Sequence, residues 1–235
     1  MRRKLPFVLG AFLAVAVFLA FLSMAIIEVS FDRQFYAAQY TALGVPEDLR
    51  VDLPTLMSYT EVLLDYLRGE VPSPNVVATV RGRNGLLYGE REVKHLRDVR
   101  YLFALTFLVR NISIVALLLL LTALLWTRNF NRGVRGYFCG SAVISCLLLI
   151  LGLLAAVDFT HYFTLFHLLT FDNDLWLLNP ATEYLIRMVP EPFFMAAALR
   201  IVLLTVGKFA LAGVAALVGV SLYAHAVKRN GCQVC

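Results

Sequence analysis

The chain has 235 residues, of which 60% are hydrophobic, and its mean hydropathy is +0.75. Soluble domains are about half apolar, so this excess excludes an ordinary water-soluble fold and predicts lipid-facing surface. The net charge of +5 does not indicate nucleic-acid binding, because eight of the 21 basic residues flank long apolar runs. In those positions they indicate membrane topology and contact with anionic lipid.

Four apolar segments are long enough to cross a bilayer as helices, which takes about 20 residues. They cover residues 5–27, 101–126, 137–157 and 201–227. The sequence therefore predicts an all-α polytopic membrane protein, a single membrane domain over residues 1–235. The first segment also has features of a signal peptide, including Ser23-Met24-Ala25 as a loose cleavage site. Its apolar run exceeds the about 7–15 residues typical of signal peptides, which favours an uncleaved anchor.

Basic residues outside the long loops all fall on one side of these spans. They are Arg2, Arg3, Lys4, Arg128, Arg132, Arg135, Lys228 and Arg229. Positive charge concentrates in cytoplasmic loops, so both termini are expected in the cytoplasm. The two long segments, 28–100 and 158–200, are then expected on the extracytoplasmic side.

The first long segment, 28–100, mixes acidic and basic residues as a folded segment does. Apolar residues recur at helical spacing over 54–68, which predicts an amphipathic helix that ends at Gly69. A valine-rich stretch, 75–80, and the Asn84-Gly85 pair then predict a small β-hairpin with its turn at Asn84-Gly85. From Glu90 the pattern becomes helical again and continues into the second span.

The second long segment, 158–200, is rich in aromatic residues, which favour the membrane interface. Pro180, Pro190 and Pro192 are expected to interrupt any long helix here. The segment is therefore predicted to form short interfacial helices. The inner tail, 228–235, carries Cys232 and Cys235, which form at most half of a metal site.

Three of the four histidines, His95, His161 and His167, lie in the two long segments, whereas His225 is near the end of the last span. Histidine transfers protons near neutral pH, so one histidine from each segment in a shared pocket would form an acid–base pair. His161 is six residues from His167, on a different helix face, and is expected to be interfacial.

The surroundings of the two remaining histidines leave alternatives open. Glu92 and Asp98 lie three residues before and after His95, so either carboxylate could orient its imidazole on a helix. The same pattern also fits a solvated, charged helix face. His167 lies among interfacial aromatic residues, where a titratable group needs a partner, whether its role is structural or catalytic.

Charged residues inside spans are candidates for function, and Arg110 and Lys208 interrupt the second and fourth spans. Arg110 could bind a lipid ester, reach the membrane surface or pair with Asp158. A metal held by Glu92, His95, Asp98, His167 and Glu191 is a weaker alternative, because no metal-binding histidine motif is present. The chain has no glycine-rich phosphate loop, so no nucleotide is expected.

Two groups of residues resemble the bacterial lipoprotein intramolecular transacylase family. The first is Glu92-x-x-His95-x-x-Asp98-Val99. The second comprises Phe166-His167, Phe171, Asn173, Trp176, Leu178, Pro180, Pro190-Glu191 and Phe193-Phe194. The order of helix, Tyr66-Leu67-Arg68, hairpin and second span is also similar, so the resemblance covers nearly the whole chain. Leu96 and Asn179 depart from the pattern, where Met and Asp are expected.

The resemblance implies an enzyme of the bacterial cell membrane that moves the sn-2 acyl chain of a diacylated lipoprotein from glycerol to the α-amine of its N-terminal cysteine. The product is lyso-form lipoprotein. Donor and acceptor belong to one substrate, so the expected partners are the lipoprotein and membrane lipid, with no nucleic acid, nucleotide, metal or other cofactor.

The resemblance further implies that His95 and His167 are catalytic. His167 would be the base and His95 the acid or oxyanion donor, or the reverse. Residues expected to bind or orient the substrate are Glu92, Asp98, Arg110, Asn173, Trp176 and Glu191. Two other classes fit the sequence: an outer-leaflet esterase or acyltransferase that uses phospholipid, and a non-enzymatic membrane interaction protein.

Overall fold

The computed structural model describes residues 4–127 and 130–231, with side chains described as far as Ser221. Arg2, Arg3, Arg128, Cys232 and Cys235 lie outside the described residues. The chain divides into two compact units. One comprises residues 1–25, 109–152 and 202–235, and the other residues 26–108 and 153–201.

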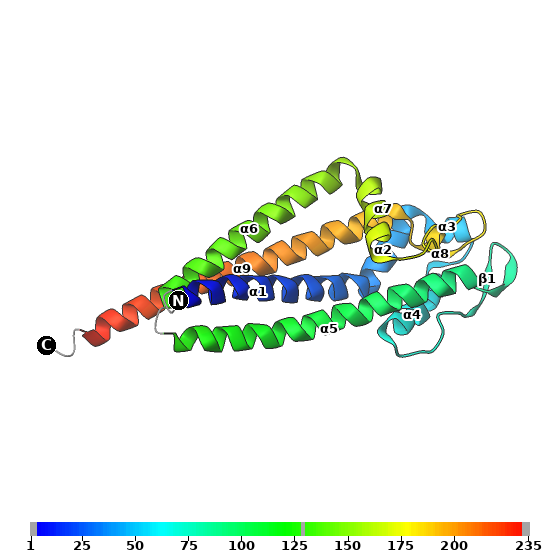
Figure 1. The fold of residues 1–235 in the computed structure, drawn as a ribbon. Helices are drawn as coiled ribbons and strands as arrows, with labels where there is room; N and C mark the ends of the chain where they lie inside the picture. Colours follow the sequence, from blue (N-terminus) through cyan, green and yellow to red (C-terminus); the bar gives the residue numbers. More distant parts are fainter. Residues whose placement is uncertain (1–3, 128–129, 232–235) are drawn as a thin grey trace. The chain divides into compact units, whose positions relative to one another are not determined.

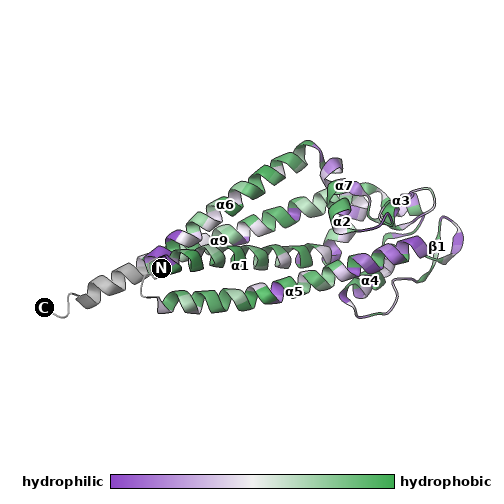
Figure 2. Ribbon diagram, viewed as in Figure 1, coloured by the Kyte–Doolittle hydropathy of each residue, from purple (hydrophilic) through white to green (hydrophobic). Residues whose placement is uncertain are grey.

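Within the described residues, four helices are long and apolar enough to cross a membrane, which confirms the predicted all-α polytopic fold. They are α1 (Leu5–Ser30), α5 (Glu90–Trp126), α6 (Phe130–Val157) and α9 (Glu191–Gly231). Most of their length is strongly hydrophobic, whereas hydrophilic residues gather on α4, on the hairpin and on the first turns of α5 (Figure 2). Leu119 and Leu149 are 65% and 63% exposed, as expected of side chains that face lipid.

In the first unit, α1 and α6 pack backbone to backbone. A Cβ atom added to Gly10 would lie 1.9 Å from the carbonyl oxygen of Gly133, and one added to Gly136 would lie 2.0 Å from that of Phe7. Small residues allow such close approach between membrane helices. Beside this contact, Phe18 meets Phe209 of α9 edge to face, with ring centroids 6.2 Å apart.

The second unit contains the polar elements, beginning with three helices. They are α2 (Arg33–Leu43), α3 (Val45–Leu49) and α4 (Leu53–Arg68). The predicted amphipathic helix is confirmed as α4: its N-cap Asp52 accepts a hydrogen bond from the Thr55 amide, and Gly69 ends it with a φ of 90°. Its buried residues include Leu56 and Leu63. The sequence pattern did not predict α2 and α3.

The predicted hairpin is confirmed as β1 (Val77–Val80) and β2 (Arg83–Leu86), but its predicted turn is wrong. The turn lies at Arg81-Gly82, both with positive φ (54° and 76°), and Asn84-Gly85 lies within β2. Outside the strands, the Asn75 side chain donates to the Tyr88 carbonyl and accepts from the Tyr88 amide. These two hydrogen bonds help to fix the register in which Val77 pairs with Leu86.

The aromatic segment between the last two spans forms α7 (Phe159–Thr170) and α8 (Leu185–Met188). Figure 1 shows both in the second unit with α2 and α3. Pro180 and Pro190 lie outside the helices, as expected, whereas Pro192 does not interrupt one. The helix α9 begins at Glu191, ten residues before the expected start of the fourth span. Pro192 is the second residue of α9, where an amide hydrogen has no partner within the helix and its loss costs nothing.

Candidate active site

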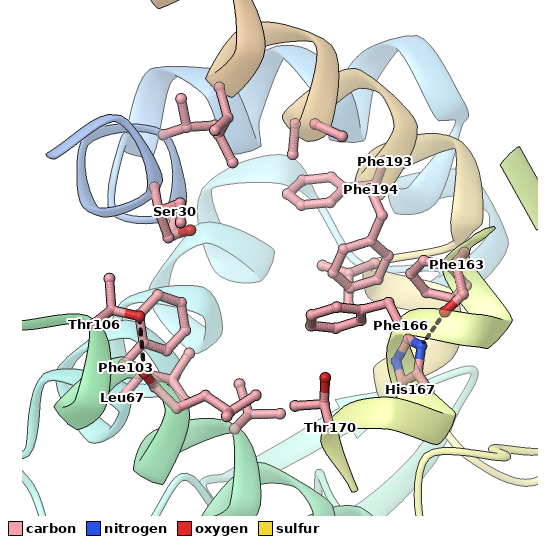
Figure 3. Close-up of a pocket in the computed structure, with 18 of the residues that line it drawn as sticks. Ser30, Leu67, Phe103, Thr106, Phe163, Phe166, His167, Thr170, Phe193 and Phe194 are labelled. Atoms are coloured by element: carbon pink, nitrogen blue, oxygen red, sulfur yellow. Dashed lines mark hydrogen bonds between the residues drawn. The ribbon is translucent and has the colours of Figure 1, made fainter. Parts of the chain in front are cut away.

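A cavity of about 590 Å³ lies within the second unit. Its walls come from the end of α1, from α2, α4 and α7, from the early turns of α5 and from the start of α9. Figure 3 shows the phenylalanine rings and short hydroxyl side chains around the open centre. Apolar side chains dominate the wall, so the cavity is suited to a lipid tail with a few polar groups that orient it.

The two predicted catalytic histidines line this one cavity. His95 comes from the second turn of α5 and His167 from the last turn of α7. Their ring centroids lie 6.4 Å apart, and each residue is only 8% exposed. Both imidazoles are therefore within reach of one substrate bound in the cavity.

His167 is held in one tautomer by its own helix. Its Nδ1 lies 2.7 Å from the carbonyl oxygen of Phe163 (dashed in Figure 3), and because a carbonyl only accepts, Nδ1 carries the hydrogen. Nε2 of the neutral ring therefore has a free lone pair, and it lies on the cavity side of the imidazole in Figure 3. Burial lowers the pKa of His167, although the bond to Phe163 opposes this shift.

Aromatic rings hold His167 on several sides. Trp176 stacks on the imidazole with centroids 4.8 Å apart and planes 28° apart, and the Phe163 ring meets it at 4.4 Å. Phe171 contacts both histidines, at 5.3 Å from His95 and 5.7 Å from His167. The sequence did not predict that Phe171 packs on both histidines or that the Phe163 carbonyl bonds to His167, because a phenylalanine does not mark a catalytic site in a sequence.

His95 has an unused hydrogen-bonding atom. Its Nδ1 is buried and has no hydrogen-bond partner among the described residues. A buried polar nitrogen without a partner is costly, and such groups in native proteins call for a specific explanation.

Glu92 does not orient His95 as the sequence pattern suggested. Its side chain is buried, and its two oxygens accept hydrogen bonds from the backbone amides of Gly89 at 2.7 Å and Leu185 at 2.6 Å. The carboxylate thus joins the start of α5 to the start of α8, where helix N-termini favour negative charge.

Asp98 also binds a group other than His95. Its Oδ2 accepts a hydrogen bond of 3.0 Å from the side-chain amide of Asn173. Asn173 therefore contacts a residue one turn from His95, and Trp176 contacts His167; both belong to the segment that joins α7 to α8. Their role in binding or orienting the substrate stays a prediction.

The remaining candidates lie away from the two imidazoles or in the other unit. Glu191 accepts a hydrogen bond of 2.6 Å from the Thr160 hydroxyl, and His161 is an exposed residue of α7. Neither lines the cavity. Arg110 belongs to the first unit, where its guanidinium donates to Asn111. Within the described residues no group of three or more metal-ligating side chains occurs.

The fold and this site define a multi-pass membrane protein with a lipid-sized cavity that carries a pair of histidines. A family model described as lipoprotein intramolecular transacylase Lit matches residues 11–194. The chain belongs to the lipoprotein intramolecular transacylase family.

Solved structures of a relative share the fold. The membrane-integral lipoprotein intramolecular transacylase of Bacillus cereus superposes with a TM-score of 0.72 at 22% identity, over 97% of this chain and 98% of that chain. The same protein with one histidine replaced by alanine superposes with a TM-score of 0.69, also at 22% identity, over 97% of this chain and 96% of that chain.

A curated relative from Aquifex aeolicus (strain VF5), described only as an uncharacterized protein, is 30% identical over 124 residues. The match covers 50% of this chain and 51% of that protein, so this chain spans about half the length of the curated relative that it matches.

Proposed function

We propose that this chain is a lipoprotein intramolecular transacylase. Its substrate is a diacylated lipoprotein, whose N-terminal cysteine carries a diacylglyceryl thioether and a free α-amine. The observation that carries the proposal is the pair of buried imidazoles, 6.4 Å apart, in one apolar cavity. Membership of the family supports it.

In the proposed reaction, the α-amine nitrogen attacks the carbonyl carbon of the sn-2 ester. His167 Nε2 takes a proton from the amine and, once protonated, delivers that proton to the departing glycerol oxygen. His95 donates a hydrogen bond to the oxyanion as a neutral imidazole, because burial lowers its pKa to about 4. An amide bond forms and an ester bond breaks, so no cofactor, nucleotide or second lipid is consumed.

The apolar cavity performs a second task in this reaction. The attack closes a ring of about eight atoms, which is unfavourable unless the substrate is held folded. Burying the acyl chain among the phenylalanines keeps the ester beside the histidines while the amine approaches.

We further propose that the site faces the extracytoplasmic side of the bacterial cell membrane and that both termini are cytoplasmic. The basic residues around the inner loop and the ends of the chain support this orientation, because positive charge concentrates in cytoplasmic segments.

Mass spectrometry of lipoprotein N-termini tests the function in a host that lacks the gene. The wild-type chain should yield lyso-form peptides, and His95→Ala and His167→Ala should each lower the rate by about 10²–10⁴-fold, the usual worth of one acid–base group.

His161→Ala is the matched control, because it removes an exposed histidine of the same helix as His167 and should leave the product unchanged. If the wild type leaves lipoproteins diacylated and consumes phospholipid instead, the protein is a different outer-leaflet acyltransferase or esterase. Full activity of both alanine variants would exclude the histidine mechanism.

A further inference from the structure

The segment that joins α7 to α8, residues 171–184 and here called the strap, is fastened to α5 on both sides of His95. Asn173 Nδ2 donates to Asp98, three residues after His95. Arg91, four residues before His95, donates to the Asp174 carbonyl, and its guanidinium lies 3.5 Å from the Asp174 carboxylate. Both anchors therefore flank His95 on neighbouring turns of α5.

The Asn173 amide is engaged at both ends. While its nitrogen donates to Asp98, its Oδ1 accepts a hydrogen bond of 3.0 Å from the Leu175 amide. This side-chain turn directs the backbone into Trp176, whose indole stacks on His167 at 4.8 Å. A continuous series of contacts thus runs from Asp98 through Asn173 and Trp176 to His167.

No hydrogen bond joins Asp98 to His95 among the described residues, and the Asp98 charge acts on His95 through space, where it opposes the lowering of the His95 pKa by burial. Asp98 Oδ2 is occupied by Asn173, and His95 Nδ1 is without a partner among the described residues. Moreover, the Asp98–Asn173 bond is exposed to solvent, so it contributes little to folding. Its effect should therefore be seen in geometry more than in stability.

We propose that Asp98 and Asn173 are positioning residues that fix the imidazole of His167, through Trp176, at its distance from His95. The inference rests on the proposed acyl transfer. The two rings come from helices far apart in the sequence, and the strap is the element that contacts both. A displacement of about 1 Å at a reacting group can cost about 10²-fold in rate.

An exchange of side chains tests the bridge. Asn173→Asp places two carboxylates face to face, so kcat should fall by about 10²-fold with little change in KM. Asp98→Asn keeps a neutral acceptor for the Asn173 amide and should lose much less. The double variant D98N/N173D restores the bridge with donor and acceptor reversed, and most of the activity should return. If Asp98→Asn is as damaging as Asn173→Asp, and the double variant stays inactive, the positioning role is overturned.

A spectroscopic readout separates this inference from the proposed function. The chain has two tryptophans, and Trp126→Phe removes the one at the end of α5. Protonated imidazole quenches a stacked indole, so the fluorescence of Trp176 should fall on acidification. The fall should disappear in His167→Ala and Asn173→Asp and return in the double variant. Unchanged quenching in Asn173→Asp overturns the inference, whereas a wild type that makes no lyso-form product overturns only the proposed function.

Thr60→Val is the control for general destabilisation. It removes a buried hydrogen bond of 2.8 Å between Tyr40 of α2 and Thr60 of α4, neither of which lines the cavity. It should lower stability while turnover per folded molecule and the Trp176 signal stay unchanged. An equal loss of turnover in Thr60→Val would show that any weakened contact has the same effect, and would overturn the assignment.

Discussion

At the residue scale, one backbone carbonyl decides the chemistry of His167. The carbonyl of Phe163 holds the hydrogen on Nδ1, so Nε2 is the atom that can accept a proton. Neither Phe163 nor this bond is visible as a motif in the sequence. The sequence selected the two histidines by residue type and segment, but the tautomer follows from helix geometry, which places a carbonyl four residues earlier beneath the ring.

This environment gives a testable pH behaviour. Because burial disfavours the charged imidazolium, the pKa of His167 is lowered from its ordinary value of about 6.5. The ring should therefore be neutral at pH 7 and become protonated only as the pH falls through the lowered pKa. An NMR titration of the His167 ring, assigned by its loss in His167→Ala, measures this. A midpoint at or above the ordinary value would contradict the buried-base assignment.

At the element scale, the parts of the fold that local sequence controls were predictable. The helix α4 has a capping Asp52, an apolar repeat and a terminal Gly69, and each of these signals acts within a few residues. The hairpin turn was not predictable from Asn84-Gly85, because the Asn75–Tyr88 pairing outside the strands sets the register. The start of α9 was missed because a proline in a first turn does not break a helix.

Glu92→Gln is expected to destabilise the protein. Glu92 joins two helix starts through buried bonds to the Gly89 and Leu185 amides, and Glu92→Gln turns one acceptor into a donor that faces an amide. We expect the free energy of unfolding to fall by about 1–3 kcal/mol, the cost of an unsatisfied buried polar group. Thermal unfolding in detergent measures the loss.

Glu90→Gln is the matched control, because Glu90 lies in the same first turn but is exposed and forms a surface ion pair with Lys94. It should change the unfolding temperature little. Equal losses in the two variants would mean that charge in the first turn of α5 matters, and that the bridge between α5 and α8 does not.

At the scale of the whole molecule, composition and charge determine how the chain relates to the bilayer. The apolar excess covers the exposed faces of the four long helices, as Leu119 and Leu149 illustrate. Polar residues gather in the second unit, where the cavity lies. The sequence predicted this division between lipid-facing and polar segments, because the hydropathy of consecutive residues is enough to locate a membrane span.

The proposed orientation is tested by labelling single cysteines in a variant that lacks the four native ones. In spheroplasts, a membrane-impermeant maleimide should label Asn84→Cys in the hairpin, since that residue is exposed and assigned to the extracytoplasmic side. Asn131→Cys, exposed at the start of α6, should react only after lysis. The reverse pattern would place the histidine cavity on the cytoplasmic side.

The sequence by itself determined the class of protein, the four apolar helices, the amphipathic helix α4 and the histidines worth considering. These depend on composition and on patterns that repeat within a few residues. Only the tertiary structure decided that His95 and His167 share a cavity and that Trp176 stacks on His167. It also decided that Glu92 accepts hydrogen bonds from backbone amides and that Asp98 accepts one from Asn173. Such contacts join residues far apart along the chain, so they depend on how whole elements pack, and no local pattern specifies them.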